Sequence, residues 1–147
     1  MKGTRLTAVM AGLFIDVAGS ALAGVIGGLV IGHLWRHSVD RSYEQWVALR
    51  FNFYLEFFGF CGTTFSTTLG GYVAALLAPA NPIVNSLAVG VLSLFLGMAL
   101  TILFPGVVPL WKAIAGASLT IPAALAGGYL ALRASAKIAT RAGRNSV

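Results

Sequence analysis

Four long apolar runs constrain the fold of this chain more than any other feature of its sequence. A hydrocarbon core about 30 Å thick is crossed by roughly 20 helical residues, and each run reaches that length. The runs cover residues 6–34, 51–78, 83–104 and 110–132. They are continuously apolar, whereas the strands of a transmembrane barrel alternate apolar and polar residues. The sequence therefore predicts an all-α polytopic membrane protein, a bundle of four transmembrane helices.

The composition agrees with this class. Hydrophobic residues make up 58% of the 147 residues and charged residues only 10%, which leaves too few polar side chains to cover a soluble domain of this size. We expect one transmembrane domain, residues 1–147, in which a short basic tail at residues 133–147 follows the last span. The lipid bilayer is then the first partner of the chain.

The positive charges predict an orientation. Basic residues are more frequent on the cytoplasmic side of membrane proteins, and an even number of spans places both termini on one side. Six of the ten Lys and Arg residues fall on that side: Lys2, Arg5, Arg133, Lys137, Arg141 and Arg144. We therefore expect both termini in the cytoplasm. The net charge of +6 is interpreted as an orientation signal, and no nucleic-acid partner is expected.

Small residues form ridges along the first, second and fourth spans. In the first span, Gly12, Gly24, Gly28 and Gly32 lie on one four-residue row that also contains Asp16. Such rows allow two helix backbones to approach closely. The fourth span partly repeats the second at an offset of 57 residues. The predicted packing positions outside the first span are Gly59, Gly70, Gly71, Gly127 and Gly128.

The second span also carries an unusual number of hydrogen-bonding side chains. One interpretation is helix packing, because hydroxyl groups in membrane helices bond to the carbonyl four residues earlier. The other interpretation is a polar path for ions or protons centred on Glu56. The residues predicted for that path are Asp16, Asn52, Glu56, Thr63, Thr64, Thr67, Thr68 and Tyr72.

Asp16 and Glu56 are the carboxylates that fall inside the predicted spans. Charge in a bilayer costs about 3 kcal/mol or more, so such residues are expected to face protein or water. At similar depth in neighbouring helices two ionised carboxylates would repel each other, which favours a proton shared between them. In the alternative, one acid pairs with a basic residue of the first loop, and the other stays protonated and hydrogen-bonded.

Metal and enzyme motifs are sparse. His33 and His37 are four residues apart and would share one helix face, which makes them a candidate metal pair, although interfacial histidines explain the spacing as well. Cys61 is the single cysteine. We expect no cofactor. No Ser-His, paired-Asp or His-Glu-x-x-His arrangement stands in the sequence, so we expect that the protein is not an enzyme.

Three resemblances involve residues described above. The acid of the first span and the Gly-Gly-Tyr-Val-Ala stretch at residues 70–74 resemble small uncharacterised four-span membrane proteins of bacteria, which implies a multi-pass protein of the bacterial inner membrane. Residues 59–67, GFCGTTFST, are similar to the broken-helix segment of four-span fluoride channels, without the two residues that usually separate its halves. Residues 12–20, GLFIDVAGS, are similar to the first helix of small multidrug transporters, in which the acid serves proton and cation exchange.

These observations favour a small ion- or proton-coupled transporter or channel-like protein that uses Asp16 and Glu56. The alternative is a structural or accessory subunit of a membrane protein complex. Both interpretations leave glycine ridges free for further contacts, so we expect a homo-oligomer or an assembly with another membrane protein.

Overall fold

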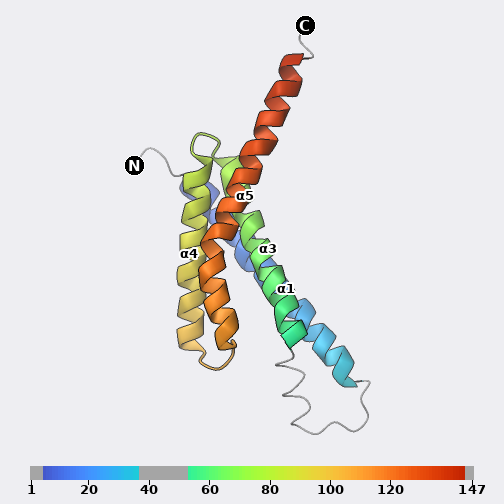
Figure 1. Ribbon diagram of the computed structural model, residues 1–147. Coiled ribbons are helices and arrows are strands. Elements are labelled where there is room, and N and C mark those ends of the chain that lie inside the picture. Colours follow the sequence, from blue (N-terminus) through green and yellow to red (C-terminus); the bar gives the residue numbers. More distant parts are fainter. Residues whose placement is uncertain (1–4, 37–52, 145–147) are drawn as a thin grey trace.

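The structure is a computed structural model that describes residues 5–36 and 53–144 (Figure 1). These residues form four helices: α1 (Leu6–Arg36), α3 (Phe53–Leu77), α4 (Pro82–Leu103) and α5 (Leu110–Arg144). No strand occurs among them, so the predicted all-α bundle is confirmed. α5 runs past the predicted end of the last span and remains helical through Arg144.

Proline and glycine set the two connections after α3. The α3–α4 turn is closed by a 3.1 Å hydrogen bond from Asn81 N to Ala78 O. Pro82 begins α4, at a position where a helix needs no backbone donor. Between α4 and α5, Gly106 has a φ of 81°, which residues with a side chain rarely adopt. Both connections are short, so each joins antiparallel neighbours.

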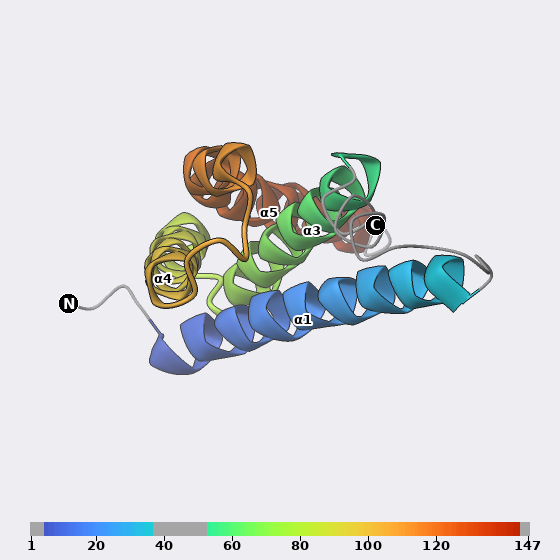
Figure 2. The ribbon, with the colours of Figure 1, turned by 90° about the horizontal axis from the view of Figure 1, so that it is seen from below.

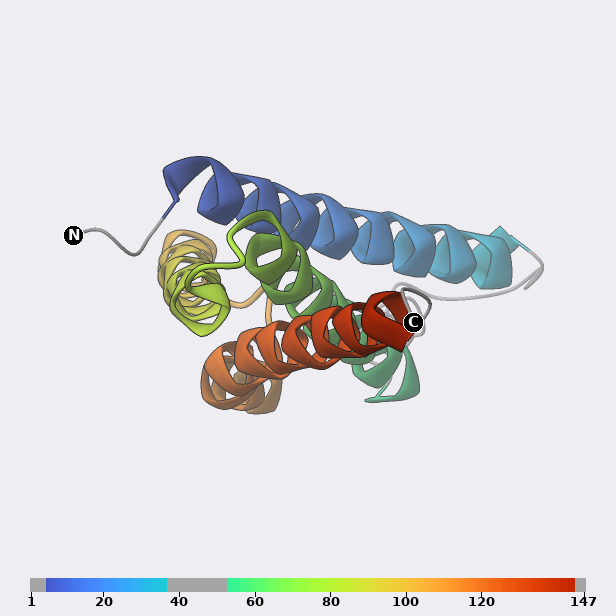
Figure 3. The same cartoon turned by 90° about the horizontal axis from the view of Figure 1, so that it is seen from above.

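α3 is the central helix of the bundle. Figures 2 and 3 show it between α1 and α5, with α4 beside α5, and it contacts all three other helices. The buried residues of α3 are all small: Ser66, Thr67, Gly70, Gly71, Ala74 and Ala75. Because small residues add little bulk, neighbouring helices pack directly on its backbone.

The helix crossings on α3 take place at glycine. A Cβ atom added at Gly70 would lie 2.5 Å from Gly12 O on α1. At Gly71 or Gly127 it would overlap a backbone carbonyl of the facing helix, which joins α3 to α5. Carbonyl groups of a helix cannot rotate away, so any side chain at these positions would push the helices apart.

The outer surface of the bundle is apolar. Phe14, Leu29, Phe58, Phe95 and Ile102 are examples of large hydrophobic side chains that are more than half exposed, and apolar surface of this extent is rare on soluble proteins. α1, α4 and α5 are each long and apolar enough to cross a membrane. These two observations identify the chain as a membrane protein.

α3 is not among the helices that meet the length and hydropathy criterion. Its sequence contains Glu56 and several hydroxyl residues, which lower its hydropathy. α3 contacts all three other helices, and it also exposes large apolar side chains such as Phe58 and Phe65. The fourth span nevertheless stays a prediction.

The two ends of the bundle differ. At the end where α4 begins, buried polar side chains join the helices: Ser86 Oγ donates a 2.8 Å hydrogen bond to Gly71 O, and Asn85 Oδ1 accepts one of 3.0 Å from Arg5 N. At the other end, the pair α1 and α3 separates from the pair α4 and α5 (Figure 1). The helix backbones are thus close together at one end, the tied end, and farther apart at the other, splayed end, where the side chains of Lys112 and Glu56 still join α5 to α3.

Candidate cation site around Asp16

Asp16 is the buried carboxylate of the bundle, with 6% of its surface exposed. Thr67 Oγ1 on α3 donates a 2.7 Å hydrogen bond to Asp16 Oδ1. Ser93 Oγ on α4 donates a short hydrogen bond to Asp16 Oδ2. Each carboxylate oxygen therefore accepts one hydroxyl proton, and three helices meet at this acid.

The close α1–α3 crossing brings these groups together. Gly70 lies three residues after Thr67, and a Cβ added at Gly70 would lie 3.2 Å from Asp16 Cβ and 2.5 Å from Gly12 O. Because Gly70 has no side chain, α1 approaches α3 closely enough for Asp16 to reach the Thr67 hydroxyl. The glycine is thus part of the reason that the acid is held in place.

A cavity of about 210 Å³ lies beside Asp16, and six of the ten residues that line it have hydroxyl side chains. Its remaining walls include Phe60, Gly97 and Gly116. A space of this size can hold several water molecules. The hydroxyl residues that line it are Ser20, Thr63, Thr64, Thr67, Ser93 and Thr120.

The hydroxyl groups of the cavity offer acceptors more than donors. Thr63 and Thr64 each donate a 2.9 Å hydrogen bond to Phe60 O, and Thr120 donates one of 2.6 Å to Gly116 O. A hydroxyl has one proton and two lone pairs, so these three oxygens keep lone pairs available after their protons are used. Together with the Asp16 carboxylate, they form surroundings suited to a cation or a proton donor.

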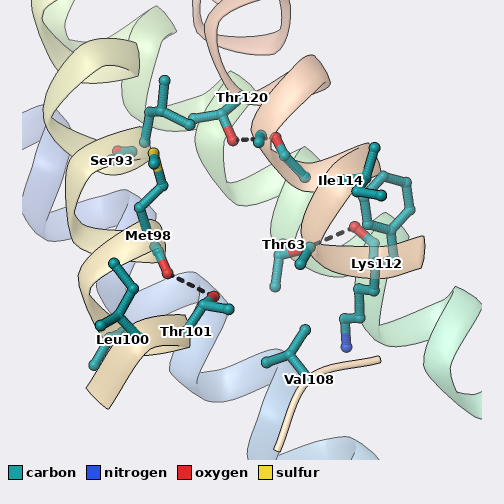
Figure 4. A pocket seen from close by; sticks show the side chains of 16 residues that line it. Thr63, Ser93, Met98, Leu100, Thr101, Val108, Lys112, Ile114 and Thr120 are labelled. Carbon is teal, nitrogen blue, oxygen red and sulfur yellow. Dashed lines mark hydrogen bonds between the residues drawn. The ribbon is translucent and has the colours of Figure 1, made fainter. Parts of the chain in front are cut away.

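A second cavity, of about 480 Å³, adjoins the first and is mainly apolar (Figure 4). It lies between α4 and α5, and Figure 4 shows Met98 and Leu100 across from Lys112 and Ile114. Six residues line both cavities: Phe60, Thr63, Ser93, Gly97, Gly116 and Thr120. The two cavities are therefore parts of one space that is polar near Asp16 and apolar beyond it.

Glu56 pairs with a residue of the fourth predicted span. Lys112 Nζ lies 2.7 Å from Glu56 Oε2, and the two side chains are 24% and 18% exposed, respectively. Glu56 lies in the first turn of α3, where the helix dipole favours a negative charge. Lys112 also lines the larger cavity, so this ion pair stands at its edge.

This geometry overturns the prediction that the two acids share a proton. Glu56 lies 11 residues before Thr67 on α3, or about 16 Å along the helix, whereas Asp16 contacts Thr67 directly. The alternative paired one acid with a basic residue of the first loop. Among the described residues the basic partner of Glu56 is Lys112, and residues 37–52 of that loop lie outside the described residues, so this alternative stays a prediction. The acids lie at different depths because α1 crosses α3 near Gly70, far from Glu56.

The other predicted pathway residues divide between two faces of α3. Thr63, Thr64 and Thr67 line the smaller cavity, whereas Thr68 and Tyr72 line neither cavity. The backbone of these last two residues lies instead where Gly127 of α5 approaches α3. A four-residue row advances by about 40° per step around a helix, which explains why one predicted row faces two neighbours. Asn52 lies outside the described residues.

The predicted glycine packing positions fall into those that contact a facing helix and those that do not. Gly12, Gly70, Gly71, Gly127 and Gly128 lie within close contact of a facing helix, and Gly59 lies near Lys112 Nζ. Gly24, Gly28 and Gly32 of α1 have no facing atom of the described chain within 4 Å of an added Cβ. α1 and α3 are still in contact at Ala23 and Gly62. Beyond that point the three glycines of α1 lack the intramolecular neighbour that their row predicted.

Four polar residues of the site, Ser20, Ser93, Lys112 and Thr120, were not predicted for it. Ser93 and Thr120 lie in apolar stretches with few other polar residues, and Lys112 lies near the start of the fourth predicted span. The one available signal was weak: Ser93 is among the few polar residues of its run. Its role becomes visible only when α4 is placed beside Asp16.

Of the two candidate metal ligands the structure describes His33, which lines neither cavity. His33 belongs to α1 and is exposed, and His37 lies outside the described residues. Within residues 5–36 and 53–144, no group of three or more His, Cys, Asp or Glu side chains could hold a metal ion. Cys61 is exposed and free.

Comparison with known proteins adds no relative. The chain matches no protein-family model, no curated protein and no solved structure.

Proposed function

We propose that the protein is a small membrane transporter or channel-like protein for cations or protons, with Asp16 as its binding carboxyl group. One observation carries this proposal: a carboxylate held by two hydroxyl groups borders a cavity whose threonine oxygens keep lone pairs available. Asp16 is buried, with 6% of its surface exposed, and charge inside a membrane is costly. An acid that borders a cavity is available to a ligand.

The charges around the cavity support a cation. Lys112 is compensated by Glu56 at 2.7 Å, so this pair adds no net charge. Asp16 then dominates the electrostatic potential of the adjoining space. A proton, or a cation that replaces it, would bind at Asp16 and be stabilised by the oxygens of Thr63, Thr64 and Thr120.

In the proposed arrangement all four helices cross the bacterial inner membrane, and both termini are cytoplasmic. α3 serves as the fourth span, supported by its central position among three helices. The start of α4 and the basic end of α5 lie at the tied end of the bundle (Figure 1), so the splayed end with Glu56 and Lys112 faces outward. A cysteine-accessibility test with membrane-impermeant reagents would establish this orientation.

Ion flux in proteoliposomes tests the proposed function. The purified protein is reconstituted and assayed with protons and with small monovalent cations, inorganic and organic, beside Asp16→Asn and Ser118→Ala, and fluoride serves as the anion control. Ser118 is the control because its exposed hydroxyl donates to Ile114 O and lines neither cavity. We expect flux in the parent and in Ser118→Ala, and none in Asp16→Asn. Folded parent protein without flux, or undiminished flux in Asp16→Asn, would refute the proposal.

An accessory or structural subunit is the second candidate. It is favoured by the open glycines of α1, Gly24, Gly28 and Gly32, which have no neighbour within the described chain and would fit a second copy or another membrane protein. For this candidate, Gly28→Leu breaks a complex that Asp16→Asn leaves intact. Size-exclusion chromatography with light scattering separates the two candidates.

A further inference from the structure

The cavity beside Asp16 has two chemically different parts. A proton or a small inorganic cation would use only the polar part of about 210 Å³. The adjoining part of about 480 Å³ would contribute nothing to the binding of such an ion. Its apolar wall includes Leu94, Met98, Ala113, Ile114 and Ala117, and hydrocarbon is the chemistry that such a wall favours.

We propose that the ligand of this site is an organic monocation with one ammonium group and an apolar body. This inference rests on the proposed function of Asp16. The ammonium group binds at the Asp16 carboxylate and donates to the nearby threonine oxygens, while the hydrocarbon body fills the apolar part. Phe60 lines both parts, and an aromatic ring near a cation stabilises it.

Charge limits the ligand to a single positive group. Lys112 lines the apolar part, but Glu56 neutralises it at a distance of 2.7 Å. One carboxylate, Asp16, remains uncompensated by a cation among the residues that line the two parts. An anion would therefore be repelled, and a dication would keep an unbalanced charge in an apolar space.

Two glycines allow the apolar part to be filled without disturbing a helix contact. Gly97 on α4 and Gly116 on α5 line both parts of the cavity, and no facing atom lies within 4 Å of a Cβ added at either one. A leucine there would occupy ligand space while meeting no backbone of another helix. Gly27 on α1 is equally open but lines neither part, so Gly27→Leu is the matched control.

The experiment measures saturable binding of the n-alkylammonium series, from methylammonium to hexylammonium, to the full chain in nanodiscs. Empty nanodiscs correct for partition into lipid, and hexanol serves as the uncharged analogue. We expect affinity to rise about fourfold for each added CH₂ group until the apolar part is full. Asp16→Asn should abolish the saturable component, and hexanol should show none.

The leucine variants locate the hydrocarbon. Gly97→Leu and Gly116→Leu should each weaken hexylammonium binding by at least tenfold. Both glycines also line the polar part, so methylammonium is compared in Ala117→Leu, which lines the apolar part alone. That variant should weaken hexylammonium binding and leave methylammonium within threefold, because only the longer chain needs the filled space. Gly27→Leu should change neither. Affinity that does not depend on chain length would overturn the inference, because the hydrocarbon would then not enter the apolar part. Equal binding of hexanol that survives Asp16→Asn would also overturn it and would identify a hydrocarbon pocket for lipid chains. If Asp16→Asn abolishes ion flux while no alkylammonium ion binds, the ligand class is wrong and the proposed function stands.

Discussion

The helix crossings at the glycines of α3 predict that replacing glycine by alanine changes stability with opposite signs at two kinds of position. At Gly71 an added Cβ overlaps the backbone carbonyl of Ala124 on α5, whereas at Gly97 the same atom meets nothing within 4 Å. Gly71→Ala and Gly97→Ala are the same chemical change, a single methyl group, in two helices of similar length. Any difference between them therefore reports the close approach of α3 and α5.

Two effects set the size of the change in the free energy of unfolding. Alanine in a helix interior is favoured over glycine by about 1 kcal/mol, and this gain applies to both variants. At Gly71 the obstacle is backbone, so α3 and α5 must separate, and overpacking of this kind costs about 1–3 kcal/mol. We take the upper end of that range because a carbonyl cannot rotate away. Gly71→Ala should destabilise the protein by about 1–2 kcal/mol, and Gly97→Ala should stabilise it by up to about 1 kcal/mol.

Reversible unfolding in mixed micelles, followed by far-UV circular dichroism as the denaturing detergent increases, measures both free energies. Gly127→Ala repeats the test from the α5 side, because its Cβ would overlap the Thr68 carbonyl. A stabilisation of Gly71→Ala equal to that of Gly97→Ala would show that α3 and α5 do not cross as described. The packing account would then be wrong, whatever the role of Asp16.

Three further predictions concern polar contacts. Glu56→Gln should lower the free energy of unfolding by about 1 kcal/mol, since the pair with Lys112 is only partly buried, and the double variant with Lys112→Met should recover most of that loss. A double-mutant cycle in micelles measures the coupling between the two residues, and additive losses would contradict the pair. Ser86→Ala removes a fully buried donor to Gly71 O and should cost about 1–2 kcal/mol in the same unfolding assay, where no loss would count against that contact. Thr67→Val keeps the shape of the residue but removes a hydrogen bond to Asp16, so proteoliposome flux should fall roughly tenfold, and unchanged flux would exclude a role for that hydroxyl.

The sequence predicts the class and the helix positions well, because both depend on local hydrophobicity. The third span, expected at residues 83–104, is α4 at Pro82–Leu103. The ridge of α1 shows where this local information ends. Gly12 contacts α3, but no atom of the described residues lies within 4 Å of a Cβ added at Gly24 or Gly28, since the part of a ridge that finds a partner depends on the crossing angle. That angle results from the packing of all the helices together.

Only the residues of the site on α1 and α3 could be predicted from the sequence. Asp16 and Thr67 stand out as polar residues in apolar runs, but Ser93 and Lys112 complete the site from helices with little polar signal. Their positions follow from the rotation of α4 and α5 around α3, which the contact of Gly71 with Ala124 helps to set. A single serine in an apolar run is equally compatible with packing, so the sequence cannot distinguish the two roles.

The central claim is that Asp16 binds a cation or proton from the cavity, and site-specific modification with dicyclohexylcarbodiimide tests it most directly. This apolar reagent reacts with protonated carboxyl groups, and peptide mass spectrometry locates the adduct on Asp16 or on Glu56. The account predicts modification of Asp16 that a saturating transported cation suppresses. No modification of Asp16 at all would contradict it, and modification at the same rate with and without each cation tested would exclude a cation as the ligand.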